Sequence, residues 1–255
     1  VNNLVQTTAA NKPTYSKQTK LVNFHSTVSM TRGNYMQTSG AKIMDRTQGT
    51  MYAFGMPTAN ATSVIMGFGT SVNAPGIRFS SNTFQTAFGT TYNLSTETHA
   101  LNLPFVAGVL WQNGSGTSTT TTSNTMSFNG VRSTFQTNNV NLTTTTNEIL
   151  RVGHSTGIAG ILNEVVVFDR KLTTEELNKV DSYFALKYGV PLKGQNNYIS
   201  SNGTTIWNRT SNQAYSNNIA GIGYDPQADL HQKQAWSTTD ATPILIGTTG
   251  LQNSN

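Results

Sequence analysis

Few acidic residues of this chain are placed where two carboxylates could act together. Hydrolysis of a glycosidic bond needs two carboxyl groups roughly 5–9.5 Å apart, with one of them held protonated. Of the 11 acidic residues, Glu175 and Glu176 form the only adjacent pair. They follow Thr173 at the start of a predicted helix, where negative charge is favoured by the helix dipole. We therefore expect this pair to be structural.

Nucleophilic chemistry is also poorly supported. The chain has no Cys, which excludes cysteine catalysis, thiolate zinc sites and disulfides. The four His residues are isolated in the sequence, and we expect each to be a hydrogen-bonded surface or loop residue. They are His25, His99, His154 and His231. These observations predict a protein without enzymatic activity.

Aromatic side chains offer a different chemistry, because an exposed ring surrounded by Asn, Asp, Gln and Arg can hold a sugar. We single out Trp111 and Tyr52 as candidate ligand-binding residues. Trp111 lies at the end of the most apolar run of the chain, at 103–112, and precedes a Thr-rich tract. It could therefore lie either in the core or at the rim of a binding surface. Trp207 and Trp236 are more typical of a small core. The predicted partner is a polysaccharide or a cell-surface glycan.

The distribution of charge argues against two other partners. The formal net charge is +5, but the 16 Lys and Arg residues are scattered singly and form no basic stripe of the kind that binds phosphates. The longest uncharged stretches are rich in Thr, Asn and Ser, which are unsuited to a membrane-spanning helix. We therefore predict neither nucleic-acid binding nor membrane insertion.

The composition favours strands over helices. Charged residues make up 11% of the chain, against roughly 25% in an ordinary soluble domain. Thr suits a pleated surface, Asn and Gly suit turns, and Asn129-Gly130 between apolar flanks is a hairpin signal. The predicted fold class is all-β, as a sandwich or jelly roll. We expect strands at 49–56, 63–68, 76–80, 103–112, 149–152 and 160–168.

One helix is predicted, over 172–189. Thr173 stands three residues before Glu176, the spacing of a capping box, and apolar residues follow at helical spacing. Gly189 and Pro191 end the helix. Short strand-like segments beyond it indicate a second small β unit.

The segment from Gly160 to Leu192 resembles the end of LamG-like domains of the concanavalin A-like lectin/glucanase superfamily. In those domains a strand of the form G-x-I/L-x-E-V-x-V-F/Y-D-R-x-L leads into a helix that ends in Y-x-x-x-K-Y-G. The matching positions are Glu164, Val165, Phe168, Asp169, Arg170, Leu172, Tyr183, Lys187, Tyr188 and Gly189. The resemblance implies a jelly-roll sandwich over residues 1–193 with one short helix near its end. We expect this unit to lack the family's opening strand.

The segment after Pro191 resembles a domain of unknown function that follows LamG-like domains in large surface proteins of Bacteroidetes. The matching residues are Tyr198, Trp207, 219–225 and 230–234. The resemblance implies a small β module over 194–255, expected to be cut short. It also implies an adhesin exported by the type IX secretion system, of the kind associated with gliding motility, on the bacterial cell surface. The chain begins with Val1, and we expect a mature or excised piece of a longer protein.

The resemblance also implies calcium, because many LamG-like and pentraxin-like relatives bind it. Ca²⁺ takes roughly six to eight oxygen ligands, usually including carboxylates. Asp225 and Asp229 lie in the segment YDPQADL and could share a loop, and Asp45 is a further candidate. The alternative is an Asp-Pro turn in which Asp225 bonds to its own backbone. Calcium is the only cofactor that we predict.

The predicted function is that of a non-catalytic segment of an extracellular adhesin, which binds carbohydrate or surfaces by contact. Two alternatives stay open. The first is a structural spacer or filament segment that contacts neighbouring segments of the same large surface protein. The second is an accessory carbohydrate-binding module of a secreted polysaccharide-degrading enzyme.

Overall fold

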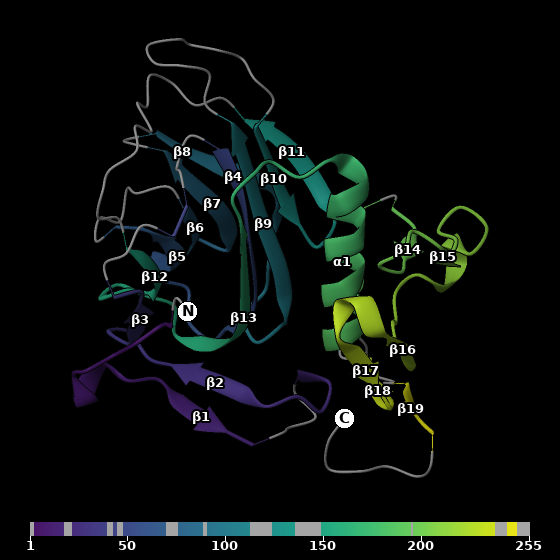
Figure 1. Ribbon diagram of the computed structural model, residues 1–255, viewed down its shortest axis with the longest axis horizontal. Helices are drawn as coiled ribbons and strands as arrows, with labels where there is room; N and C mark the ends of the chain where they lie inside the picture. The colour runs from purple at the N-terminus through teal and green to yellow at the C-terminus, as the bar shows by residue number, and fades with distance from the viewer. Residues whose placement is uncertain are drawn as a thin grey trace.

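The computed structural model describes residues 3–17, 22–39, 43–44, 48–69, 76–88, 91–112, 124–135, 149–194, 196–237 and 244–248. Within these residues two antiparallel sheets face each other as a β-sandwich, and helix α1 and a small β module lie on one side of it (Figure 1). The predicted all-β fold with one α-helix is confirmed for the described residues. Among them, no helix is both long and apolar enough to cross a membrane.

The larger sheet has the strand order β1-β2-β13-β4-β9-β10-β11. Its strands are β1 (Thr14–Ser16), β2 (Thr27–Met30), β13 (Gly160–Phe168), β4 (Gln48–Pro57), β9 (Phe105–Gln112), β10 (Asn124–Phe128) and β11 (Val131–Phe135). The second sheet has the order β3-β12-β5-β6-β7-β8. Its strands are β3 (Tyr35–Gln37), β12 (Leu150–Gly153), β5 (Ser63–Phe68), β6 (Gly76–Ser80), β7 (Thr83–Phe88) and β8 (Thr91–Thr98). All the expected strands are present, and Asn129 and Gly130 turn between β10 and β11 with positive φ as predicted.

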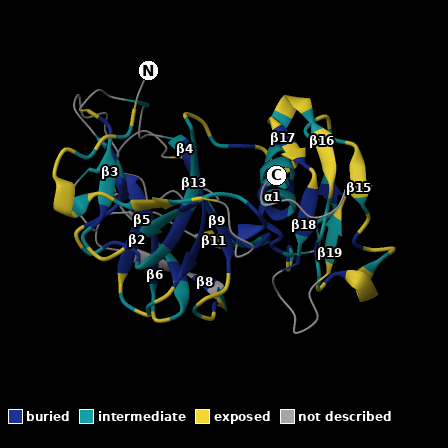
Figure 2. Ribbon diagram, turned by 90° about the horizontal axis from the view of Figure 1, so that it is seen from below, coloured by how far each residue is buried: buried dark blue, intermediate teal, exposed yellow. Residues whose placement is uncertain are grey.

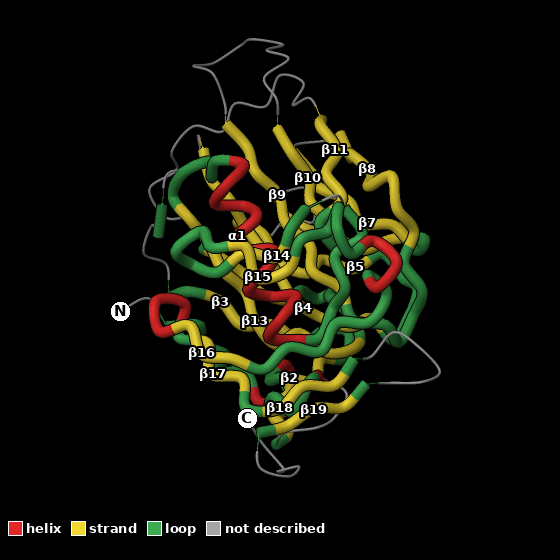
Figure 3. Tube along the Cα trace, turned by 90° about the vertical axis from the view of Figure 1, so that its right-hand side faces the viewer, coloured by secondary structure: helices red, strands yellow, loops and turns green. Residues whose placement is uncertain are grey.

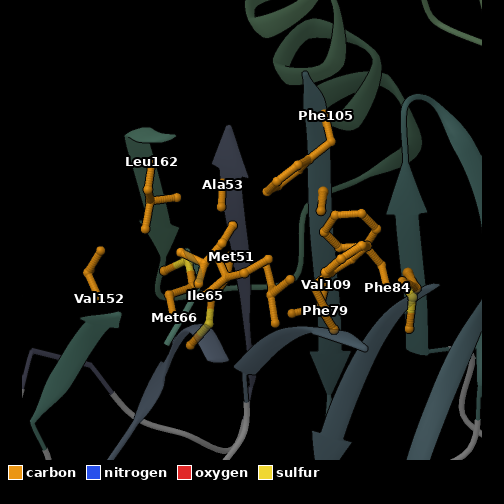
Figure 4. Close-up of a cluster of buried hydrophobic side chains, with 14 of the residues drawn as sticks. Met51, Ala53, Ile65, Met66, Phe79, Phe84, Phe105, Val109, Val152 and Leu162 are labelled. Atoms are coloured by element: carbon orange, nitrogen blue, oxygen red, sulfur yellow. The ribbon is translucent and has the colours of Figure 1, made fainter. Parts of the chain in front are cut away.

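The larger sheet is covered on both faces. Successive side chains of a strand point to opposite sides, so Met51 and Ala53 of β4 pack into the core between the sheets, with Val109 of β9 (Figure 4). The alternate residues Tyr52 and Phe54 pack on the other face, against α1. The central strands of this sheet are therefore a buried middle layer.

Helix α1 (Thr174–Tyr188) forms the layer outside this sheet. Thr173 and Glu176 make the predicted capping box, and Gly189 ends the helix with φ of 68°. The ring of Tyr188 stacks on Phe54 at a centroid distance of 3.7 Å. The local signals that predicted the helix are confirmed, and its apolar face is what holds it on the sheet.

A buried ion pair also holds α1 on the sheet. Arg132 of β11 donates to Asp181 at 3.0 Å and to Asn178 at 2.5 Å, and Ser127 Oγ donates to Asp181 at 3.4 Å. Asp181 is fully buried. Desolvation raises its pKa, and the charge of Arg132 opposes that rise. The charge of Arg132 therefore offsets part of the cost of burying the Asp181 carboxylate.

The C-terminal module lies on the far side of α1 from the sandwich, as Figures 1 and 2 show. In Figure 3, which looks at this side of the molecule, the module lies in front of the sandwich. Its described strands pair as β14 (Tyr198–Ile199) with β15 (Thr205–Trp207), β16 (Gly223–Asp225) with β17 (Leu230–Gln232), and β18 (Gln234–Trp236) with β19 (Leu245–Gly247). A small core of Ala185, Leu192, Tyr198 and Ile219 joins it to α1. The helix thus packs on both the sandwich and the module. The division of the chain into two domains at 193/194 stays a prediction.

Asn23 connects the sandwich, the helix and the module. Its side chain is fully buried, and it donates to the carbonyl oxygens of Leu186 and Lys187 at 3.3 and 2.9 Å. Its Oδ1 accepts from the N–H of Trp236 at 2.6 Å. One side chain therefore satisfies carbonyls in the last turn of α1 and holds β18 beside them.

Candidate binding groove

A groove of about 950 Å³ lies between β13, α1 and the C-terminal module. Glu164, Val166 and Phe168 line it from one face of β13, because alternate residues of a strand share a face. Val180 and Tyr183 line it from α1, at the spacing of one helical turn. The groove is thus built from the outer face of a strand and the side of a helix.

The wall of the groove on the C-terminal module carries exposed apolar side chains. Ile206 of β15 is 55% exposed, Ile222 just before β16 is 43% exposed, and Tyr224 of β16 is 71% exposed. Figure 2 shows the exposed residues of β15 and β16 on this module. Clustered exposed apolar groups are typical of interaction sites. This wall is the part of the groove that offers a partner apolar contact.

Uncharged polar side chains stand at the same edge. Asn202 Oδ1 accepts from Ser200 Oγ at 2.6 Å and from the N–H of Thr204 at 3.0 Å. Gln227 Oε1 accepts from Ser201 Oγ at 3.3 Å. Asn202, Thr204 and Gln227 are exposed and line the groove. The rim therefore offers amides and a hydroxyl to a partner.

The charged groups near the groove are paired with one another. Arg170 donates to both carboxylate oxygens of Glu176 at 2.6 and 2.7 Å, and Lys179 contacts Glu175 at 3.1 Å. The bond from Arg170 and the backbone N–H of Thr173 lower the pKa of Glu176 to about 2. Glu176 is therefore ionised at neutral pH and acts in the helix cap, the structural role expected from the sequence.

Glu164 is the centre of a polar cluster at one end of the groove. It accepts from the hydroxyls of Tyr183 and Tyr188 at 2.8 and 2.7 Å and from Lys187 Nζ at 2.8 Å. Burial and the charge of Glu164 raise the pKa of both tyrosines. Four of the residues that carry the LamG-like resemblance thus meet in one hydrogen-bonded group, which fastens the end of α1 to β13.

The two aromatic residues predicted to bind ligand lie inside the protein. Trp111 and Tyr52 are both 0% exposed. Trp111 packs between the sheets near Phe68, and Tyr52 stacks on Phe184 of α1. The prediction of an exposed platform at these residues is wrong, because both faces of the larger sheet are covered. Tyr224, which the sequence reasoning missed, is an exposed ring of the module and lies against His231 of β17.

Asp225 and Asp229 flank a short turn beside the groove. Asp225 accepts from the N–H of Ser201 at 2.8 Å and from its Oγ at 2.5 Å. These two bonds from Ser201 lower the pKa of Asp225. Asp225 thus stands at the start of the turn Pro226–Ala228 with its carboxylate engaged by Ser201, and its side chain does not cap the turn.

A metal site at this turn would need further oxygen ligands. In the described part of the chain, no three His, Asp or Glu side chains are grouped as a metal would require. Asp45 lies outside the described residues. Calcium binding at Asp225 and Asp229 stays a prediction.

The four histidines have different surroundings. His25 contacts Gln232 at 3.2 Å, and His99 contacts the Leu103 carbonyl at 2.8 Å. Desolvation lowers the pKa of both. The ring of His231 lies against Tyr224, with 5.3 Å between centroids. His25, His99 and His154 are loop residues with hydrogen-bond contacts, and His231 is exposed on β17, so all four fit the expected surface or hydrogen-bonded loop positions.

His154 belongs to a sequence pattern that the residue-by-residue reasoning overlooked. Gly153–Gly157 reads GHSTG, a match to the Gly-x-Ser-x-Gly pattern of hydrolases. That pattern marks a nucleophile only on a strained turn between a strand and a helix. Here it follows β12 without a helix, and Ser155 is not among the residues with positive φ. Ser155 Oγ lies 3.1 Å from the adjacent His154 Nδ1, as part of a local turn.

Comparison with known proteins gave one family match. The model of a family described as a domain of unknown function (DUF8202) matches residues 176–255, which include most of α1 and the C-terminal module. Comparison with curated proteins found no match.

Several solved structures are similar to this chain at low identity. The heptameric SAP-like pentraxin from Limulus polyphemus is 12% identical, over 96% of this chain and 94% of that one, with a TM-score of 0.45. The Trypanosoma rangeli sialidase is 11% identical, over 64% of this chain and 28% of the sialidase, with a TM-score of 0.45. Tailspike protein 2 of an Escherichia coli O157:H7 bacteriophage is 14% identical, over 74% of this chain and 28% of that one, with a TM-score of 0.47. The chain thus spans less than a third of the sialidase and of the tailspike.

Proposed function

We propose that this chain is a non-catalytic segment of an extracellular bacterial surface protein, which binds glycans or glycan-covered surfaces by contact. The groove between β13, α1 and the C-terminal module is its binding surface. The observation that carries the proposal is the lining of this groove, where the exposed apolar side chain of Ile206 and the exposed polar residues Asn202, Thr204 and Gln227 all take part. An apolar surface with a few placed polar groups is what a ligand site requires.

The surroundings of two carboxylates support binding rather than catalysis. Glu176 is ionised and bound to Arg170, and Glu164 is surrounded by three donors, so each carboxylate is engaged in holding the fold. The resemblance to LamG-like domains and to adhesins of Bacteroidetes supports the cell-surface location. The same contact function would serve in an accessory module of a polysaccharide-degrading enzyme.

The proposal is tested by retention of the purified chain on insoluble polysaccharides and on whole bacterial cells, measured by sedimentation. We expect retention on at least one of them and its loss in Ile206→Asp, which places a charge on the groove wall. Ile244→Asp is the matched control, since Ile244 is also exposed on the module but does not line the groove. Folded protein that is retained by no polysaccharide and no cell type would overturn the proposal.

Calcium is tested in the same assay. If Asp225 and Asp229 bind Ca²⁺ for ligand recognition, retention falls in a chelator and returns when calcium is added. Equal retention with calcium and with chelator would show that binding of the polysaccharide or cell does not need calcium.

A structural segment is the second candidate function. It is favoured by the exposed large apolar side chains of the C-terminal module, which neighbouring segments of the same surface protein would cover. They are Ile206, Tyr215, Ile222, Tyr224 and Ile244. This candidate predicts a higher unfolding temperature when the chain is joined to the next segment of its parent protein. An unchanged unfolding temperature would contradict it.

A further inference from the structure

We infer that the open edge of β13 takes a short extended segment of a partner protein, which adds to the larger sheet as one more strand. The segment is uncharged and carries an apolar side chain at every second position. The inference goes beyond the proposed function, because it depends on main-chain groups of β13 rather than on the groove residues that are offered to a glycan. It rests on three observations, which concern the pairing of β13, its exposure and the walls beside it.

β13 has a neighbouring strand on both sides only at its first residues. β4 pairs with it along its whole length, whereas β2 pairs only with Gly160 and Ile161. The side chain of Asn163 then bridges the two chains: its Oδ1 accepts from the N–H of Val28 at 3.0 Å, and its Nδ2 donates to the Ser26 carbonyl at 2.6 Å. Within the described part of the chain, no strand pairs with β13 on this side beyond Ile161.

The chain that leads into β2 turns away from β13. Asn23 and Phe24 have φ of 55° and 65°, outside the range of a strand. Asn23 bonds to the carbonyl oxygens of Leu186 and Lys187 in the last turn of α1. The residues that could have continued the pairing are therefore held against the helix instead.

The unpaired part of β13 is also its more exposed part. Val165 packs on the core between the sheets and Val166 on the core beneath α1, yet every residue from 163 to 168 is only half-buried. In β4, which has a neighbouring strand on both sides, residues 49–57 are all buried. The two strands lie side by side in one sheet, so the difference comes from the missing neighbour.

The alternation of hydrogen bonds identifies the main-chain groups at this open edge. The N–H of Thr58 donates to the Ala159 carbonyl at 2.9 Å, so every second residue of β4 from there to Thr50 bonds to β13. The bulge lies on β13 and leaves the alternation along β4 unbroken. The partners of these β4 residues in the second half of β13 are Glu164, Val166 and Phe168. The N–H and C=O groups of Val165 and Val167 therefore point to the open edge, and no described residue is bonded to them.

The side chains beside the edge select the partner. Native proteins protect an open edge with Lys or Pro, and the run EVVVF at 164–168 contains neither. Val166 and Phe168 line the groove together with Val180 of α1 and Ile206 of the module. The side chains of an added strand that face this apolar lining are therefore apolar. A charged side chain there would lose water without gaining a partner, because the charged groups of the groove are paired with one another.

The walls also decide between a single strand and a second copy of this chain. The groove lies between β13, α1 and the C-terminal module. A second copy carries the same helix and module beside its own β13, so two of these edges meet only if both walls open. One extended segment needs no such opening, and main-chain hydrogen bonds to a sheet edge are an established mode of peptide recognition.

The probe is a labelled peptide of about seven alternating Val and Thr residues, which at roughly 3.3 Å per residue spans the open edge. Its binding to the purified chain is measured by fluorescence anisotropy. We expect the peptide to bind, and to bind roughly tenfold more weakly or not at all when it is N-methylated throughout, since this removes its N–H groups and keeps its side chains. The same peptide with Lys in place of Val should also bind roughly tenfold more weakly.

Val167→Pro tests the edge in the chain itself, because it removes an N–H that is not bonded to β4. Val167→Ala is the matched control, since it shortens the same side chain and keeps the N–H. We expect affinity for the peptide to fall roughly tenfold or more in Val167→Pro and to change little in Val167→Ala. Circular dichroism establishes that both variants are folded. If Val167→Pro does not fold, the comparison of the two peptides decides.

Equal binding of the methylated and unmethylated peptides, equal binding by the two folded variants, or no binding at all would overturn the inference. Dimers in sedimentation velocity that Val167→Pro abolishes and the peptide does not dissociate would also overturn it, and would assign the edge to a second copy. Retention on polysaccharides is measured on the same variants. Val167 does not line the groove, so we expect equal retention of Val167→Pro and the natural chain. Failure of peptide binding therefore leaves the glycan proposal in place, and failure of retention leaves the inference in place.

Discussion

At the scale of single residues, ion pairs of similar geometry have different consequences because their burial differs. Arg132–Asp181 and Lys179–Glu175 have nitrogen–oxygen distances of 3.0 and 3.1 Å. The Asp181 side chain is 0% exposed, whereas the Glu175 side chain is 70% exposed. Water screens the second pair, but it cannot solvate Asp181 if Arg132 is removed.

We therefore predict that Arg132→Ala lowers the free energy of unfolding by about 3–5 kcal/mol, because it leaves a buried carboxylate without its cation. Lys179→Ala, at the exposed pair, should change it by less than about 1 kcal/mol. Urea unfolding followed by tryptophan fluorescence measures both. Equal effects of the two substitutions would show that the buried pair is not what holds α1 on β11.

The tyrosines around Glu164 give the protein a stability that depends on pH. Burial and then the charge of Glu164 raise the pKa of Tyr183 and Tyr188 in the folded state. In the unfolded chain both titrate near the ordinary value of about 10. Above that pH the unfolded state binds fewer protons than the folded state, so the free energy of unfolding falls as pH rises.

We expect this loss of stability to begin near pH ~10 and to be less steep in Tyr188→Phe, which cannot ionise. Urea unfolding at a series of alkaline pH values measures the slope. Tyr224→Phe is the control, since Tyr224 is exposed. If Tyr188→Phe and the natural chain have the same slope, the tyrosine cluster is not its cause.

At the scale of elements, α1 ends at Gly189 in a left-handed backbone conformation, which residues other than glycine adopt only at a cost in free energy. Gly189 has φ of 68°, and a Cβ there would lie 2.5 Å from the carbonyl oxygen of Trp236. The glycine therefore both ends the helix and allows β18 to approach it.

We predict that Gly189→Ala lowers the free energy of unfolding by more than about 1 kcal/mol, through strain and through displacement of β18. Gly223→Ala should be close to neutral, because Gly223 does not have positive φ and has open space at its Cβ position. Thermal and urea unfolding of the two variants compare these effects. A neutral Gly189→Ala would mean that the approach of Trp236 adds nothing to stability.

At the scale of the whole molecule, the sandwich and the C-terminal module share α1. The helix packs on Tyr52 and Phe54 with one face and on the small core around Tyr198 with another. Asn23, from the sandwich, bonds to the last turn of the helix and to Trp236. We therefore expect the described units to unfold together in one transition.

Asn23→Gly tests this coupling, because glycine tolerates the φ of 55° at this position and removes only the side chain. We expect a loss of about 1–3 kcal/mol and faster proteolytic cleavage within the module, since buried carbonyls lose their donor. Limited proteolysis with mass spectrometry locates the cuts. Cleavage that is unchanged, or faster only in the sandwich, would contradict a connecting role for Asn23.

The sequence by itself determined the features that depend on neighbouring residues. The capping box at Thr173 and Glu176 and the turn at Asn129-Gly130 are local interactions, so their positions were predictable, and the strands followed from short apolar runs. The alternation of β4 side chains between the two faces of the larger sheet also follows from local geometry. Whether one or both of these faces are covered does not. That depends on where α1 packs.

Only the tertiary structure decided which residues form the candidate site. Trp111 and Tyr52 are apolar side chains on central strands, and the packing of a second sheet and of α1 buries them. Glu164 meets Tyr183 and Tyr188 because the chain reverses between β13 and the helix. Tyr224 lies on a three-residue strand, which is too short for its pattern to show which face is open. Long-range packing, rather than local preference, leaves that ring exposed.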